Sequence, residues 1–128
     1  MVTEERTKSL FGTRVLVIED EYYLAADLSR ALADAGAEVI GPVGTLAEAQ
    51  ATVEAGGFDC AVVDMNLRGS IAHAVADQLG ARRVPFVIVT GYDRASLPDS
   101  LRDVPHVEKP FAPREVVDRI FRMRAALG

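Results

Sequence analysis

Five polar residues in this sequence each follow a short apolar run, at the point where a strand of a sheet would end: Glu19, Asp20, Asp64, Thr90 and Lys109. Because the carboxyl ends of parallel strands meet at one edge of a sheet, we expect these side chains to lie together. Three carboxylates at one edge repel one another, which raises their pKa values and costs stability unless a cation shares the site. Oxygen ligands of this kind, with room for water, suit Mg²⁺.

The same residues have the chemistry that phosphoryl transfer needs. Beside a bound Mg²⁺, Asp64 stays ionised and keeps an oxygen that can attack phosphorus. The metal, the ammonium of Lys109 and the hydroxyl of Thr90 can then hold the three equatorial oxygens of the transferring group. We therefore predict that Asp64, Thr90 and Lys109 carry the reaction and that Asp64 is the phosphoryl acceptor.

Short runs rich in β-branched residues alternate with helical patterns along the chain, which is typical of a parallel sheet covered on both faces. The expected strands are Val15–Ile18, Glu38–Gly41 closing on Pro42, Cys60–Asp64, Phe86–Val89 and His106–Val107. Five strands alternating with five helices predict an α/β fold, a doubly wound five-stranded parallel sheet of the (βα)₅ flavodoxin-like type with strand order 2-1-3-4-5.

The helices between these strands have recognisable ends. One pattern runs from about Glu21 to Ala35 and stops at Gly36, and another starts at the capping box of Thr45 and Glu48 and stops at Gly56. After a loop through Leu67, Arg68 and Gly69, a third helix is expected to bury Ile71, Ala74, Val75 and Gln78. Pro98 makes the fourth helix short or delays it to about Ser96, and Pro113 begins the last, with Val116, Val117, Ile120, Phe121 and Leu127 on one face.

Composition narrows the class of protein. The 128 residues, 49% hydrophobic and 26% charged, fit one globular domain, expected over 13–128 behind a leader at 1–12. With a net charge of −5, the chain lacks the excess of basic residues that is typical of a nucleic-acid binder. No apolar run reaches the roughly 18 residues that a membrane span needs. With no secretory signal pattern, a cytoplasmic location is expected. The single cysteine, Cys60, is expected to be a buried apolar thiol.

Taken together, Glu19-Asp20, Asp64, Thr90 and Lys109-Pro110-Phe111 resemble the two-component response-regulator receiver family over roughly residues 13 to 127. The resemblance implies that Asp64 takes a phosphoryl group from a histidine kinase or phosphotransfer protein. It also implies that Asp20, Asp64 and the backbone carbonyl of Asn66 hold Mg²⁺, with Glu19 close by or acting through water. The family more often has Asp at the position of Glu19.

A narrower resemblance lies in the stretch Pro85 to Tyr92, PFVIVTGY, which looks like the PFxFATGY motif of the FAT GUY receivers. Ile88 and Val89 depart from the Phe and Ala of that motif. Members of this subgroup are associated with histidine kinases of the HWE and HisKA2 classes. They occur as stand-alone proteins and as the carboxyl-terminal domain of hybrid kinases, and the sequence leaves both forms, and the oligomeric state, open.

Two other classes of protein are alternatives to a receiver. A phosphatase of the haloacid-dehalogenase type needs a second Asp as general acid two residues after the nucleophile, where this chain has Asn66, whose amide supplies no proton. A pseudo-receiver that only binds a partner would not need the acceptor, metal and lysine positions intact. His73 and His106 have no metal-binding spacing. We therefore expect a signalling switch that catalyses only its own phosphorylation and slow dephosphorylation.

The expected output is a conformational change after the fourth strand. Receivers usually have Tyr or Phe three residues before the site lysine, and this chain has His106, which is smaller and more polar. Gly91 frees the backbone after Thr90, and Pro98 interrupts the helical pattern that follows. Phosphorylation is therefore expected to pull Thr90 toward Asp64 and to bias residues 91–103 between two arrangements, with His106 secondary.

Overall fold

A computed structural model describes residues 9–67, 70–71, 73–91 and 97–127. Its strands are β1 Arg14–Ile18, β2 Glu38–Val43, β3 Cys60–Asp64, β4 Asn66–Leu67, β5 Ser70–Ile71, β6 Phe86–Thr90 and β7 His106–Glu108. Its α-helices are α1 Tyr22–Asp34, α2 Leu46–Ala55, α3 His73–Ala81 and α4 Pro113–Leu127.

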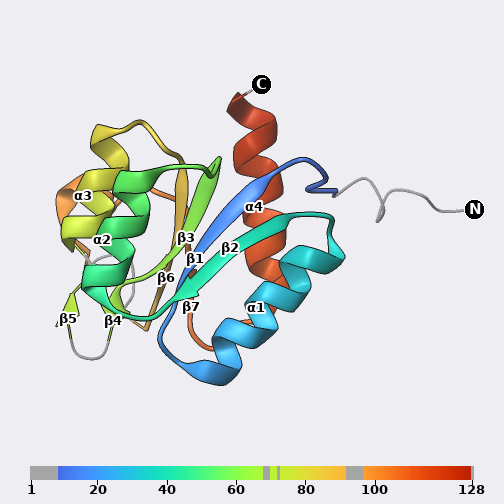
Figure 1. Cartoon of the computed structure of the whole chain (residues 1–128), viewed down its shortest axis with the longest axis horizontal. Coiled ribbons are helices and arrows are strands. Elements are labelled where there is room, and N and C mark those ends of the chain that lie inside the picture. Colours follow the sequence, from blue (N-terminus) through green and yellow to red (C-terminus); the bar gives the residue numbers. More distant parts are fainter. Residues whose placement is uncertain (1–8, 68–69, 72, 92–96, 128) are drawn as a thin grey trace, which may run out of the picture.

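The main sheet has the order β2-β1-β3-β6-β7, and all of its neighbouring strands are parallel. Counted along the chain, this is the predicted order 2-1-3-4-5, so the doubly wound topology is confirmed. In Figure 1, α1 and α4 lie on one side of the sheet, and α2 and α3 lie on the other. The switch in strand order falls between β1 and β3. A binding site is therefore expected at the carboxyl ends of these two strands.

Alternating side chains of the central strands build two cores, one on each face of the sheet. On β1, Leu16 and Ile18 point to the α2 and α3 side, while Val15 and Val17 point to the α1 and α4 side. All residues of β3 and β6 are buried. Cys60 belongs to the core under α1 and α4, where burial raises the pKa of its thiol to about 11, as expected for an inert apolar residue.

Helices α1 and α2 start at side-chain caps. Thr45 accepts the amide of Glu48 at 3.1 Å, which confirms the predicted capping box, and Gly56 ends α2 with φ +73°. Glu21 caps α1 by accepting the amides of Tyr23 and Leu24, so α1 begins one residue later than the pattern suggests.

The second strand is longer than predicted. It continues through Pro42 to Val43, whereas the sequence pattern placed its end at Gly41. Because β2 is an edge strand, the missing N–H of proline costs no bond to a further strand. The pairing of β2 with β1 also shifts register between Leu16 and Ile18, so the strand carries a bulge at this point.

The expected loop after the third strand is partly ordered as a small hairpin. β4 and β5 pair antiparallel, with Asn66 opposite Ile71, while residues 68–69 lie outside the described part of the chain. Because Ile71 belongs to this hairpin, α3 starts later than predicted. Val75 is buried as expected and Gln78 is half-buried, but the other buried residues are Ala76 and Leu79, and Ala74 is exposed.

Between β6 and β7 the described residues form a single 3₁₀ turn, Asp99–Leu101, in place of a fourth α-helix. Pro98 directly precedes the turn, which agrees with the prediction that this proline keeps the element short. Leu97 and Leu101 are buried and hold the segment against the core. The predicted start near Ser96 lies outside the described residues.

On α4, Val116, Val117 and Ile120 are buried as expected, but Leu127 is 67% exposed because it ends the helix. None of the described helices is long and apolar enough to cross a bilayer.

Candidate functional site

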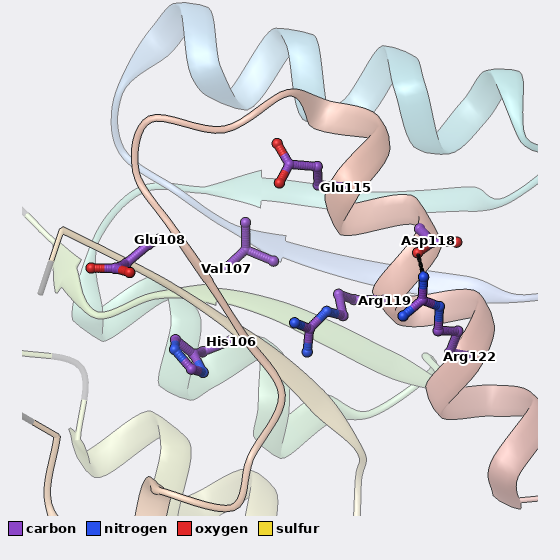
Figure 2. Close-up of a pocket in the computed structure, with 7 residues that line it drawn as sticks. All are labelled: His106, Val107, Glu108, Glu115, Asp118, Arg119 and Arg122. Atoms are coloured by element: carbon purple, nitrogen blue, oxygen red, sulfur yellow. Dashed lines mark ion pairs between the residues drawn. The ribbon is translucent and has the colours of Figure 1, made fainter. Parts of the chain in front are cut away.

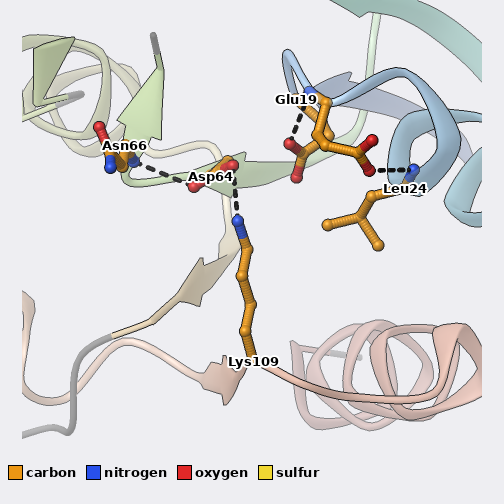
Figure 3. A network of polar contacts seen from close by, with 6 residues as sticks. Glu19, Leu24, Asp64, Asn66 and Lys109 are labelled. Carbon is orange, nitrogen blue, oxygen red and sulfur yellow. Dashed lines mark hydrogen bonds and ion pairs between the residues drawn. The ribbon is translucent and has the colours of Figure 1, made fainter. Parts of the chain in front are cut away.

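The five strand-end residues predicted from the sequence come together at one edge of the sheet. Glu19 and Asp20 follow β1, Asp64 is the last residue of β3, and Thr90 is the last residue of β6. Lys109 follows β7, and its backbone amide donates to the carbonyl of Thr90 at 2.8 Å. Figure 3 shows the Lys109 side chain extending from this segment to Asp64, across the edge from Glu19.

Asp64 is held from two sides. Its Oδ2 accepts from the Nζ of Lys109 at 3.1 Å, and its Oδ1 accepts the backbone amide of Asn66 at 3.0 Å. The side chain is only 2% exposed, so the lysine charge offsets much of the cost of burying a carboxylate. Burial lowers the pKa of Lys109, but the hydrogen bond and charge of Asp64, helped by Glu19 and Asp20, raise it above its usual value.

Glu19 is a buried acid with an incomplete set of partners. Its Oε2 accepts the backbone amide of Glu21 at 3.0 Å, whereas its Oε1 is buried and has no hydrogen-bond partner among the described residues. Burial, and next the neighbouring carboxyl of Asp64, raise the pKa of Glu19 to about 8. The crowding of carboxylates that we expected is therefore real, but loss of solvent contributes more than repulsion does.

Three of the predicted ligands form a compact oxygen cluster. Glu19, Asp20 and Asp64 each offer a carboxylate oxygen, and these atoms lie within 4.8 Å of one another. A divalent cation would neutralise this charge and give the unpartnered Oε1 of Glu19 a partner, so the residues fit Mg²⁺. Asn66 adjoins the cluster because its backbone amide donates a hydrogen bond to Asp64. Thr90, at the end of the neighbouring strand β6, is 1% exposed.

The third acidic residue of the turn, Glu21, takes no part in this cluster. Its carboxylate caps α1, accepting the amides of Leu24 at 2.7 Å and Tyr23 at 3.3 Å. Glu21 was not among the predicted site residues, although its position just before a helical pattern is a signal for an N-cap. Glu21 thus ties the start of α1 to Glu19, since its amide donates to Glu19 while its side chain holds the helix.

The raised pKa of Glu19 predicts how the stability of the metal-free protein depends on pH. Between about pH 4.5 and about pH 8 the folded protein keeps a proton that the unfolded chain releases, so the free energy of unfolding should fall as pH rises. One proton contributes at most about 1.4 kcal/mol per pH unit. Glu19→Gln should remove this contribution, and urea unfolding in EDTA at several pH values measures it. Equal slopes in wild type and variant would contradict the prediction.

A separate pocket of about 430 Å³ lies between β7 and α4. It is lined by His106, Val107, Glu108, Glu115, Asp118, Arg119 and Arg122, and Figure 2 shows Arg119 extending from α4 toward the strand. Two of these lining residues, Asp118 and Arg122, form an ion pair at 2.6 Å. None of the predicted acceptor or metal residues lines it. Neither His106 nor His73 joins a cluster of metal-binding side chains in the described part of the chain.

The chain resembles known proteins in sequence and in fold. None of the known protein-family models matches the chain. The swarming motility regulation protein RssB of Serratia marcescens is 32% identical over 111 residues, which are 83% of this chain and 50% of RssB. The chain spans about half the length of the curated relatives it matches.

Solved structures give two further likenesses. SdrG from Sphingomonas melonis Fr1 superposes with a TM-score of 0.73 at 40% identity, over 90% of this chain and 95% of SdrG. The response regulator PhyR from Brucella abortus superposes with a TM-score of 0.79 at 27% identity, over 97% of this chain and 54% of PhyR.

Proposed function

The chain belongs to the response-regulator receiver family, and we propose that it is a phospho-accepting switch that takes a phosphoryl group onto Asp64. The observation that carries the proposal is the pairing of the buried carboxylate of Asp64 with Lys109 at 3.1 Å, inside the acidic cluster at the sheet edge. A carboxylate held this way has an oxygen positioned for attack and a cation positioned for the charge that develops.

The proposed phosphoryl donor is a histidine kinase or a phosphotransfer protein. A carboxylate oxygen of Asp64 forms the new bond to phosphorus, the bond from phosphorus to the donor's imidazole nitrogen breaks, and its electron pair stays on that nitrogen. Lys109 gives up part of its contact with Asp64 to stabilise the phosphoryl oxygens, and the Thr90 hydroxyl donates to one of them. Glu19, Asp20, Asp64 and the backbone carbonyl of Asn66 would hold Mg²⁺, which when bound supplies further positive charge for these oxygens.

A switch fits the site better than a metabolic phosphatase does. The position two residues after Asp64, where such a phosphatase has its general acid, is Asn66, which contacts Asp64 through its backbone amide and has an exposed side chain. No carboxyl group therefore stands at that position to protonate a leaving group. The resulting acyl phosphate should be hydrolysed only slowly, and its lifetime is then available for signalling.

The proposed output is a change in the segment after β6. In the described part of this segment, one 3₁₀ turn and the buried Leu97 and Leu101 hold the chain, so few contacts need to break. Movement of Thr90 onto the phosphoryl group would bias residues 91–103 between two arrangements. His106 is half-buried on β7 and has the secondary role.

Titration with beryllofluoride and Mg²⁺ tests the proposal, because this complex mimics a phosphoryl group on aspartate. We expect amide resonances of Thr90 and of residues 97–103 to shift and their hydrogen exchange to change. A protein that shows no response is not a phospho-accepting switch. If residues 91–103 are equally rigid in both states while His106 alone changes burial, the switch lies at His106 instead.

The subgroup and the parent protein are also part of the proposal. The stretch from Pro85 to Gly91 supports a FAT GUY receiver served by a kinase of the HWE or HisKA2 class, and Tyr92 of that motif lies outside the described residues. Phosphotransfer rates from purified kinases of these classes and of others would test it; equal rates would remove the subgroup assignment. The chain works either as a stand-alone receiver or as a domain of a longer signalling protein.

A further inference from the structure

The bulge in edge strand β2 lies directly beside the acidic turn. Leu16 pairs with Ile40, but Ile18 pairs with Val43. Two residues of β2, Gly41 and Pro42, therefore lie opposite one residue of β1, Val17. An unbroken register would instead place Pro42 opposite Ile18. Proline has no N–H for the ladder, so the extra residue brings Val43, which has both backbone groups, to the end of β1.

Gly41 is the residue that this bulge requires. Its φ is +93°, and a Cβ at this position would lie 2.9 Å from the amide nitrogen of Val43 and 3.0 Å from the carbonyl oxygen of Val17. Both contacts are with backbone atoms, which cannot rotate away as a side chain can. Any other residue at Gly41 must therefore displace the bulge or the strand beside it.

The two residues after the bulge contact the backbone of the acidic pair. The carbonyl of Val43 accepts the amide of Glu19 at 3.0 Å. Gly44 lies against the next residue, since a Cβ there would be 3.4 Å from the Cα of Asp20 and 3.7 Å from the carbonyl oxygen of Glu19. The bulged end of β2 thus fixes where the chain leaves β1 and turns toward the site.

We propose that the segment Gly41–Gly44 is a positioning element for Glu19 and Asp20, and that it sets the affinity of the acidic cluster for a divalent cation. The inference rests on the proposed function, because it assumes that the cluster holds Mg²⁺. Metal affinity depends on carboxylates held within about 0.5 Å of their working positions. The segment acts through the backbone of the ligands, because its glycine, proline and valine side chains have no atom that binds a metal.

Gly41→Ala tests the proposal, with Gly36→Ala as its matched control. Gly36 also has a positive φ, +102°, and a Cβ there would lie 3.0 Å from the backbone nitrogen of Phe11, far along the chain from the acidic turn. Both variants should be less stable than wild type. In calorimetric titration of the folded proteins with Mg²⁺, Gly41→Ala should bind about 10-fold or more weakly, as disruption of ligand-orienting groups does, while Gly36→Ala binds like wild type.

A second pair of variants keeps the proposal testable if Gly41→Ala does not fold. Gly44 has no positive φ, so Gly44→Ala places its methyl group in ordinary contact with Asp20. Gly44→Val adds two γ-methyl groups to a Cβ that is already in contact and should crowd Asp20. Mg²⁺ affinity should fall more for valine than for alanine. Wild-type affinity in folded Gly44→Val and Gly41→Ala would overturn the positioning role. Absence of Mg²⁺ binding by the wild type would instead overturn the proposed function, and this inference with it.

Discussion

Replacing Asp64 by asparagine is expected to abolish phosphorylation of the chain by acetyl phosphate in the presence of Mg²⁺. The amide has no anionic oxygen to attack phosphorus, and it also removes the charge that pairs with Lys109 at 3.1 Å. Asparagine has nearly the same shape, and its oxygen can still accept the amide of Asn66, so the fold should survive. Intact-mass spectrometry should show one added phosphoryl group on the wild type and none on the variant.

Asp59→Asn is the matched control for this experiment. Asp59 precedes the other end of β3, where its Oδ2 accepts the backbone amide of Arg14 at 2.8 Å, and its pKa is lowered mainly by that hydrogen bond. The same chemical change at Asp59 leaves the strand-end carboxylates untouched, so labelling should equal that of the wild type. Labelling of Asp64→Asn at the wild-type level would place the acceptor elsewhere.

Mg²⁺ is expected to raise the melting temperature of the wild type, and Asp20→Ala to remove most of that rise. A cation that binds the folded cluster but not the unfolded chain stabilises by mass action, about 2.7 kcal/mol at 100 times its dissociation constant. Removing Asp20 takes one of the three carboxylates from the cluster. In the metal-free protein this change relieves repulsion within the cluster but also removes an attraction to Lys109, so the measure of metal binding is the shift caused by Mg²⁺.

The measurement is thermal unfolding with and without Mg²⁺ at constant ionic strength, because screening alone stabilises a chain of net charge −5. Asp27→Ala serves as the control, since Asp27 is an exposed residue of α1 that pairs with Arg30 at 3.7 Å and lies outside the acidic cluster. This variant should keep the full shift. An undiminished shift in Asp20→Ala would place the metal at another site.

The strands were predictable because buried parallel strands are continuous apolar runs. Their order was predictable because alternating strands and helices favour the common doubly wound topology. The details that failed depend on tertiary surroundings. Pro42 marked the end of a strand by local rules, yet an edge position accepts proline. Ile71 fitted the face of a helix, but pairing with Asn66 placed it in a hairpin instead. Such pairings between residues of a short loop leave little periodic signal.

The strand-end residues of the site were predictable for the same reason as the sheet. Their side chains have distinctive chemistry at the ends of recognisable strands. The groups that hold these side chains were not predictable, because they are backbone groups: the amides of Glu21 and Asn66 and the carbonyl of Val43. Every position of a chain has such groups, so the sequence does not single them out. The raised pKa of Glu19 likewise follows from burial, which becomes known only once the packing around it is known.

The prolines at the two outer strands have a consequence for self-association. β2 contains Pro42 within its bulge, and β7 has three residues, with Pro105 immediately before it and Pro110 two residues after it. An outer strand invites aggregation when it offers a long, flat row of unpaired amides and carbonyls to another molecule. Here both outer strands are short or bent and lack amide donors at or next to these points. The sheet therefore offers little to an added strand, and the molecule should resist edge-to-edge polymerisation at high concentration.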